Sequence, residues 1–146
     1  MFLLTCSNSE QHEVWLHMTW IYEKGEHRWK HHWHNSFAGF VPGHKGKGAT
    51  GKCPSDVTAP EAAAVLSRAI ALNTGSHEWP ERLYAVYRGV IYEAVPTRPG
   101  ESYHAYPWRQ LQGRPPLPKS ILKQLEQQAI AEGTQAKYRK WVKKHT

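Results

Sequence analysis

The first third of the chain alternates bulky apolar and other residues with a period of two. This alternation runs through Val14, Leu16, Met18, Trp20 and Tyr22. A period of two predicts a β-strand, and Lys24-Gly25 is a pair that favours a tight turn. Residues 27–34 are then predicted to return as a second strand with an aromatic face and a basic face. A short strand or bend is expected at 36–41, and Pro42-Gly43 ends it.

A helical pattern follows the first strands. Thr58 and Glu61 have the spacing of a capping box, with Pro60 early in the first turn. Apolar residues then recur at intervals of three and four, at Ala62, Val65, Leu66, Ala69 and Ile70. This spacing predicts an amphipathic helix over residues 59–72. The helix is expected to end at residues 73–75.

The second half of the chain is predicted to contain a hairpin, a further strand and two helices. Arg88-Gly89 separates the apolar runs 82–87 and 90–95, so we expect a hairpin with a two-residue turn. Residues 102–108 form a candidate third strand. Ile121, Leu122, Leu125 and Ala129 predict a helix that Gly133 ends, and Thr134 is predicted to cap a last helix.

These elements predict an α+β fold with a largely antiparallel sheet built from hairpins, one central amphipathic helix and two C-terminal helices. Strands that come in hairpins, without βαβ crossovers, favour this class. With 146 residues the chain suits one domain. We therefore expect a flexible leader at residues 1–12 and a single α+β domain at 13–146. The two cysteines favour a reduced, cytoplasmic compartment, and no apolar run is long enough for a membrane span.

Charge adds a functional prediction. The net charge is +7 with histidine neutral, which suits a nucleic acid or another polyanion and also suits simple solubility. Residues 27–55 contain no Asp or Glu, and their second half alternates lysine with glycine. Glycine-rich backbone between lysines favours anions, so phosphate contacts are predicted here and along the last helix. The candidate nucleic-acid-binding residues include Trp33, which is predicted to stack on unpaired bases. The others are predicted to contact phosphates, and they are Arg28, Lys30, Lys45, Lys47, Thr50, Lys52, Lys140, Lys143 and Lys144.

Two familiar sites are poorly matched. Residues 46–53 approach a P-loop, but Cys53 replaces the Ser or Thr that holds magnesium and Pro54 disfavours the helix that should begin there. The histidines of residues 27–44 lack the paired spacing of zinc ligands. We therefore expect no cofactor and no metal.

His104, between Tyr103 and Ala105 and two residues before Tyr106, is the best candidate for chemistry. Cleavage of RNA by its own 2′-hydroxyl needs a base, an acid and cations for the phosphate, and histidine suits the first two roles. His104, Arg88 and Tyr106 are the candidate catalytic residues, although His104 also suits a simple structural role in a strand. In outline, a small basic domain with a helix followed by an antiparallel sheet is similar to bacterial ribonuclease toxins. That resemblance implies an RNA substrate and a metal-independent cut.

The leading hypothesis is a nucleic-acid-binding domain that prefers RNA or single strands, because no recognition-helix motif is present. A small metal-independent ribonuclease is one alternative. The other is a protein-interaction module that docks on an acidic protein partner, since exposed Trp, Tyr and Arg are common interface anchors. No membrane contact is expected.

Overall fold

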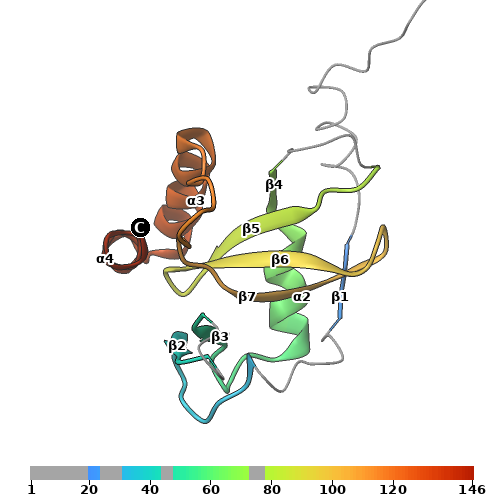
Figure 1. Cartoon of the computed structure of the whole chain (residues 1–146), viewed down its shortest axis with the longest axis horizontal. Coiled ribbons are helices and arrows are strands. Elements are labelled where there is room, and N and C mark those ends of the chain that lie inside the picture. The colour runs from blue at the N-terminus through green and yellow to red at the C-terminus, as the bar shows by residue number, and fades with distance from the viewer. Residues whose placement is uncertain (1–19, 24–30, 44–47, 73–77) are drawn as a thin grey trace, which may run out of the picture.

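The computed structural model describes residues 20–23, 31–43, 48–72 and 78–146. In these residues, five strands form a mixed, mostly antiparallel sheet in the order β1-β7-β6-β5-β4 (Figure 1). The strands are β1 (Ile21–Tyr22), β4 (Ile70–Leu72), β5 (Arg82–Tyr87), β6 (Val90–Arg98) and β7 (Ser102–Pro107). Strands β4 to β7 form an antiparallel meander, and β1 pairs parallel with β7. The predicted α+β class is confirmed.

Each face of the sheet is covered by different helices. Tyr84, Val86 and Ile91 point toward α3 (Lys119–Glu132) and α4 (Gln135–His145), and pack on Leu125 and Tyr138. The side chains at the alternate strand positions, Leu83, Ala94 and Tyr103, point to the opposite face. There they pack on Leu66 of α2 (Ala59–Ser67) and on Trp20, the residue before β1. The strand period of two therefore creates two separate cores, one on each side of the sheet.

Helix α2 begins as the capping box predicts. The Glu61 amide donates to Thr58 Oγ1 at 3.2 Å, and the Thr58 hydroxyl donates to the Glu61 carboxylate at 3.1 Å. The helix ends at Ser67, however, and not at residue 72. Ile70–Leu72 is strand β4, which pairs with β5. The predicted C-terminal boundary of this helix was wrong.

The hairpin of β5 and β6 is confirmed, together with its turn at Arg88-Gly89. Both turn residues have positive φ, 51° and 76°, as a two-residue turn of this twist requires. Strand β7 and helix α3 also agree with prediction, and Gly133 ends α3 in the left-handed conformation. Thr134 precedes α4, but its hydroxyl makes no capping bond to the α4 backbone. That hydroxyl bonds Glu132 and Ala129 of the preceding helix.

The acid-free segment forms a small sheet of its own, in which β2 (Gly39–Val41) pairs antiparallel with β3 (Thr50–Lys52). Residues 31–34 of the predicted return strand form no strand, so that part of the prediction was wrong. The remainder of that strand and most of the first one lie outside the described residues. The two-stranded sheet lies beside β7, below the main sheet in Figure 1.

Candidate nucleic-acid interface

A groove of about 400 Å³ lies between β7, β3 and the segment that follows β7. Its polar lining comes from three parts of the chain that are far apart in sequence. These residues are His31, Thr50, Glu93, His104, Tyr106, Arg109 and Arg114. A surface with two imidazoles, two guanidinium groups and two hydroxyls can bind an oxyanion such as a phosphodiester.

The strand geometry places the residues of β7. His104 and Tyr106 are two positions apart and so share a face of the sheet, opposite Val95 and Glu93 of β6. The His104 ring lies 2.8 Å from the Thr97 hydroxyl, measured from Nδ1 to Oγ1. Two predicted catalytic residues therefore lie in the same groove.

Strand β3 approaches β7 closely because it carries Gly51. A Cβ atom at Gly51 would lie 3.1 Å from both the Cδ and the carbonyl oxygen of Pro107. The Gly51 carbonyl accepts a hydrogen bond of 2.8 Å from His31 Nδ1, and the His31 ring stacks on Tyr106 with centroids 5.4 Å apart. Since a carbonyl only accepts, Nδ1 carries a proton, and in the neutral form of the ring the lone pair is on Nε2.

A buried carboxylate forms the floor of the groove. Glu93 is 1% exposed and accepts hydrogen bonds from Tyr84 at 2.6 Å, Tyr106 at 2.5 Å and Arg114 at 3.0 Å. Burial alone would raise the pKa of Glu93, but these three donors and the Arg114 charge hold that pKa below its ordinary value. The carboxylate is therefore ionised at neutral pH, and it fixes Tyr106 in position.

The C-terminal end of α4 packs against β2. The Phe40 ring stacks on Trp141 at 5.8 Å and lies 5.0 Å from the His145 ring, while the Arg109 guanidinium lies 5.2 Å from the Phe40 centroid. Burial lowers the pKa of His145, and the nearby positive charges of Lys144 and Arg109 lower it further. The described part of the acid-free segment and the lysine-bearing helix are therefore neighbours beside the groove.

Three lysines of α4 remain available to solvent. Lys140, Lys143 and Lys144 are exposed and make no ion pair in the described part of the chain. By contrast, Arg139 of the same helix is paired with the Glu126 carboxylate at 2.9 Å. The charges of these three lysines are thus not neutralised by any acid among the residues that the structure describes.

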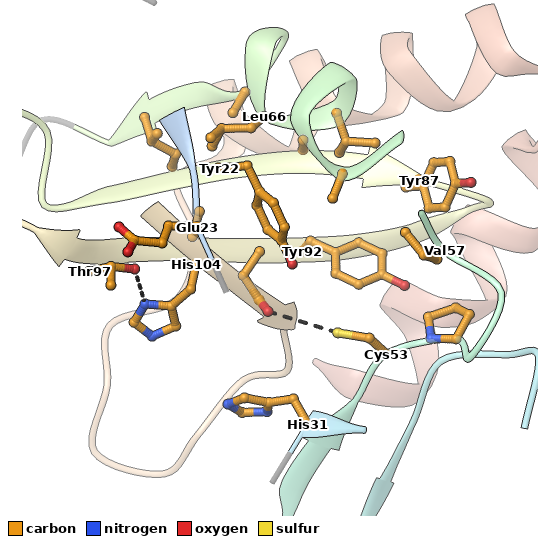
Figure 2. Close-up of a pocket in the computed structure, with 18 of the residues that line it drawn as sticks. Tyr22, Glu23, His31, Cys53, Val57, Leu66, Tyr87, Tyr92, Thr97 and His104 are labelled. Carbon is orange, nitrogen blue, oxygen red and sulfur yellow. Dashed lines mark hydrogen bonds between the residues drawn. The ribbon is translucent and has the colours of Figure 1, made fainter. Parts of the chain in front are cut away.

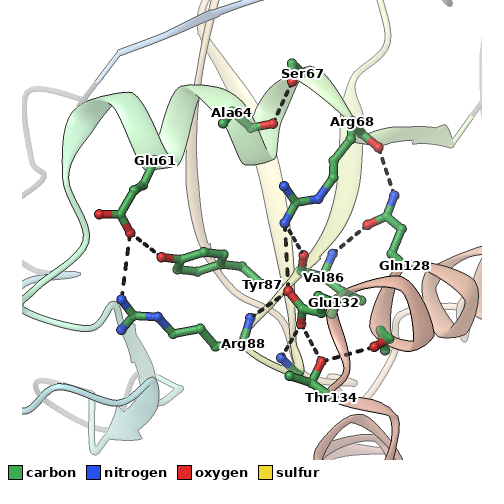
Figure 3. A network of polar contacts seen from close by, with 12 residues as sticks. Glu61, Ala64, Ser67, Arg68, Val86, Tyr87, Arg88, Gln128, Glu132 and Thr134 are labelled. Carbon is green, nitrogen blue, oxygen red and sulfur yellow. Dashed lines mark hydrogen bonds and ion pairs between the residues drawn. The ribbon is translucent and has the colours of Figure 1, made fainter.

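Arg88 lies in a different place from the other predicted catalytic residues. Its side chain pairs with Asp56 at 2.8 Å and with Glu61 at 3.7 Å, as Figure 3 shows in part. The backbone amides of Arg88 and Gly89 donate to the Glu132 carboxylate. Arg88 lies in the turn just before strand β6 begins at Val90, whereas His104 is opposite Val95 of the same strand. At roughly 3.3 Å per residue, about 17 Å of β6 separates Val90 from Val95. Arg88 fastens the β5–β6 turn to α2, while its backbone amide anchors the turn to the end of α3.

The remaining predicted binding residues are spread more widely. Thr50 lines the groove, and Lys52 ends β3. Trp33 forms an edge-to-face pair with the exposed ring of Phe37 and donates from Nε1 to the Phe37 carbonyl at 2.9 Å. Arg28, Lys30, Lys45 and Lys47 lie outside the described residues.

Sequence reasoning did not select His31 as a groove residue, or Glu93, Arg109 and Arg114 at all. Glu93 carries a usable signal, because it interrupts the apolar face that Ile91 and Val95 define in β6. An acid at a core-facing strand position requires partners, which predicts a buried polar cluster. Nothing in the surrounding sequence shows that Arg114 reaches Glu93 or that Arg109 lines the groove.

Comparisons with protein-family models, curated proteins and solved structures give no match, so the groove is interpreted from its own geometry. Among the described residues, no three His, Cys, Asp or Glu side chains are grouped in a way that could hold a metal ion. In the same residues, no helix has the length and apolar character needed to cross a bilayer.

Proposed function

We propose that this protein binds single-stranded nucleic acid, with RNA preferred, across the groove between β3 and β7. The observation that carries the proposal is the contact of Phe40 with Trp141, His145 and Arg109. This contact supports a shared surface for the acid-free segment, the segment after β7 and the lysines of α4. A strand that crosses the groove would meet positive charge on both sides.

The chemistry of the surface fits an extended polyanion. Arg109 offers a planar guanidinium to a phosphate, while the lysines of α4 act as point charges along the backbone. The ring of Phe37, which is 56% exposed and packed on Trp33, offers a face on which an unpaired base can stack. Stacking of this kind favours single strands, because bases in a duplex already stack on each other.

Binding is tested by fluorescence anisotropy with a labelled 15-nucleotide single-stranded RNA and with a duplex DNA of the same length. With four phosphate contacts, raising salt from 50 to 200 mM is expected to weaken RNA binding by about 50-fold. Lys144→Gln is expected to lower the slope of log affinity against log salt by about 0.7. Lys123→Gln is the matched control, since it removes the same charge from the exposed side of α3, which packs on β4 and β5.

An affinity that does not depend on salt, or equal effects of the two lysine variants, would contradict the proposal. A pull-down with and without nuclease supplies a further check. A partner protein that stays bound after nuclease treatment would instead favour an interaction module for an acidic protein.

A second function, metal-independent cleavage of RNA, is favoured by the two histidines of the groove. His31 and His104 both line it, together with Tyr106 and Arg109. When the His31 ring is neutral its lone pair is on Nε2, which suits a base for the 2′-hydroxyl, and the protonated form of His104 suits the acid for the leaving 5′-oxygen. Glu93 is not suited to the role of base, because its carboxylate is buried and already accepts three hydrogen bonds.

Cleavage is tested by incubating RNA with the protein in EDTA and looking for 2′,3′-cyclic phosphate ends. His31→Ala and His104→Ala are each expected to lower the rate by about 10²-fold or more while leaving RNA binding within a few-fold. His34→Ala is the control, because His34 is an exposed histidine of the same segment that does not line the groove. Intact RNA with the wild-type protein would leave binding alone as the function.

A further inference from the structure

A second, larger cavity of about 780 Å³ lies on the other face of the sheet, between α2, β5 to β7 and the chain from Cys53 to Thr58 (Figure 2). Small side chains leave this space open. Its walls include five alanines, Ala62, Ala69, Ala85, Ala94 and Ala105. A cavity of this volume with a mainly apolar wall has the size of sites that hold small organic molecules.

The hydroxyl of Tyr92, at this cavity, is a buried polar group with no hydrogen-bond partner among the residues that the structure describes. Tyr92 is 8% exposed, and its hydroxyl makes no hydrogen bond with the described residues. Figure 2 shows its ring extending from β6 toward the side of the cavity formed by Cys53 and Val57. Burial raises the pKa of Tyr92 well above its usual value, so the hydroxyl keeps its proton and can donate it. A buried hydroxyl without a partner is unfavourable, and a ligand with an acceptor would remove that cost.

The charged groups at the cavity are matched to each other. Glu23 and Arg98 lie at one end and form an ion pair of 3.0 Å, and Glu23 also accepts from Ser102 at 2.6 Å. Burial raises the pKa of the Cys53 thiol to about 11, and its Sγ donates to the Ala105 carbonyl at 3.8 Å. The Glu23 carboxylate and the Arg98 guanidinium are thus paired with each other, which favours an uncharged ligand. Three histidines, His31, His32 and His104, also line the cavity.

We propose that this cavity binds an uncharged, planar and mainly apolar small molecule whose single carbonyl or hydroxyl oxygen accepts a hydrogen bond from Tyr92. The alanine walls contact the flat body of the ligand, and the Tyr92 hydroxyl fixes its orientation. The cavity shares His31 and His104 with the groove. Tyr92 and the alanines lie on the α2 side, so the proposal does not depend on the binding of nucleic acid in the groove.

Three fluorescent probes of one shape test this site on the full chain: naphthalene, 2-naphthol and 2-naphthoate. We expect 2-naphthol to bind more tightly than naphthalene, and 2-naphthoate to bind at least tenfold more weakly than 2-naphthol. Tyr92→Phe removes only the hydroxyl. It is expected to lower the preference for 2-naphthol over naphthalene by about fivefold, which is the value of one neutral hydrogen bond.

Tyr138→Phe is the matched control. Tyr138 is also buried, but its hydroxyl donates to the Leu122 carbonyl at 3.0 Å in the opposite core. Without probe, thermal unfolding of Tyr92→Phe is expected at a higher temperature than wild type, and that of Tyr138→Phe at a lower one. Tyr138→Phe should leave the preference among the probes unchanged.

Ala62→Trp, on α2, is expected to fill the cavity and abolish binding of all three probes in a protein that still unfolds cooperatively. The proposal is overturned if the folded wild-type protein binds no probe, or if Tyr92→Phe keeps the full preference for 2-naphthol. Probe binding that survives Ala62→Trp would overturn it as well. Displacement of 2-naphthol by single-stranded RNA would assign the cavity to an unstacked base and would also refute the small-molecule proposal.

Discussion

Replacing Glu93 with glutamine changes the charge at the centre of the groove floor while keeping the shape of the side chain. The wild-type carboxylate accepts three hydrogen bonds, from Tyr84, Tyr106 and Arg114. Each hydrogen bond to a charged group contributes about 1.5–3 kcal/mol to stability. A glutamine side chain would retain one or two hydrogen bonds between neutral groups, which contribute about 1 kcal/mol each. Arg114, whose side chain is 30% exposed, can turn part of its charge toward water.

These values predict that Glu93→Gln lowers the free energy of unfolding at pH 7 by about 3 kcal/mol, which is a large part of a typical total. The assay is urea unfolding followed by tryptophan fluorescence, since Trp108 is buried in the core on this face of the sheet. Glu126→Gln is the control. Its carboxylate pairs with the exposed Arg139 at the surface, so we expect a much smaller loss than for Glu93→Gln.

The same variant has a predicted pH dependence. The pKa of Glu93 is lower in the folded protein than its ordinary value of 4.5, so the folded state binds fewer protons than the unfolded state. The stabilisation is therefore complete above about pH 5 and declines as the pH falls through the folded pKa. The difference between wild type and Glu93→Gln should shrink below pH 4. Surface substitutions usually change the free energy of unfolding by less than about 0.5 kcal/mol. If Glu93→Gln changes it by no more than that at pH 7, the reasoning is refuted.

Three further predictions concern other parts of the fold. Gly89→Ala should destabilise more than Gly113→Ala when both are measured by thermal unfolding, because both have positive φ but only at Gly89 would a Cβ meet Lys137, at 2.9 Å. Glu132→Ala should cost about 1–3 kcal/mol in urea unfolding, since it leaves the amides of the β5–β6 turn without their acceptor. Cys53 should be alkylated about 100-fold more slowly at pH 8 than an ordinary thiol, because burial raises its pKa from 9.0 to about 11, and peptide mass spectrometry with and without urea measures this.

Local patterns were sufficient for elements whose signals lie within a few residues. The capping box at Thr58, the turn at Arg88-Gly89 and the end of α3 at Gly133 each depend on the chemistry of adjacent positions. The segment Ile70–Leu72 is different, because its apolar residues fit the spacing of a helix as well as a strand. It becomes strand β4 because β5 needs a partner along its outer edge. Beyond β4, side chains replace that partner, since Arg68 donates to the Val86 carbonyl and Gln128 accepts from the Val86 amide.

The candidate site was predictable only where it follows strand alternation. His104 and Tyr106 share a face because they are two residues apart in β7, and this could be inferred without coordinates. Whether Arg88 or Arg109 reaches them is decided by how the chain returns over the sheet, which no local spacing encodes. Gly51 is similar, because its need for close contact with Pro107 arises from a residue 56 positions later (107 − 51).

The parallel pairing of β1 with β7 has a consequence for the order in which the fold forms. Strands β4 to β7 meet their neighbours in sequence, whereas Ile21 joins Ser102 across 81 residues (102 − 21) with only two residues of strand. Closing so long a loop for so few hydrogen bonds is unfavourable until the meander exists to receive them. Strand β1 should therefore dock last and detach first, and the Ile21 and Glu23 amides should exchange with solvent deuterium well before those of β5 and β6.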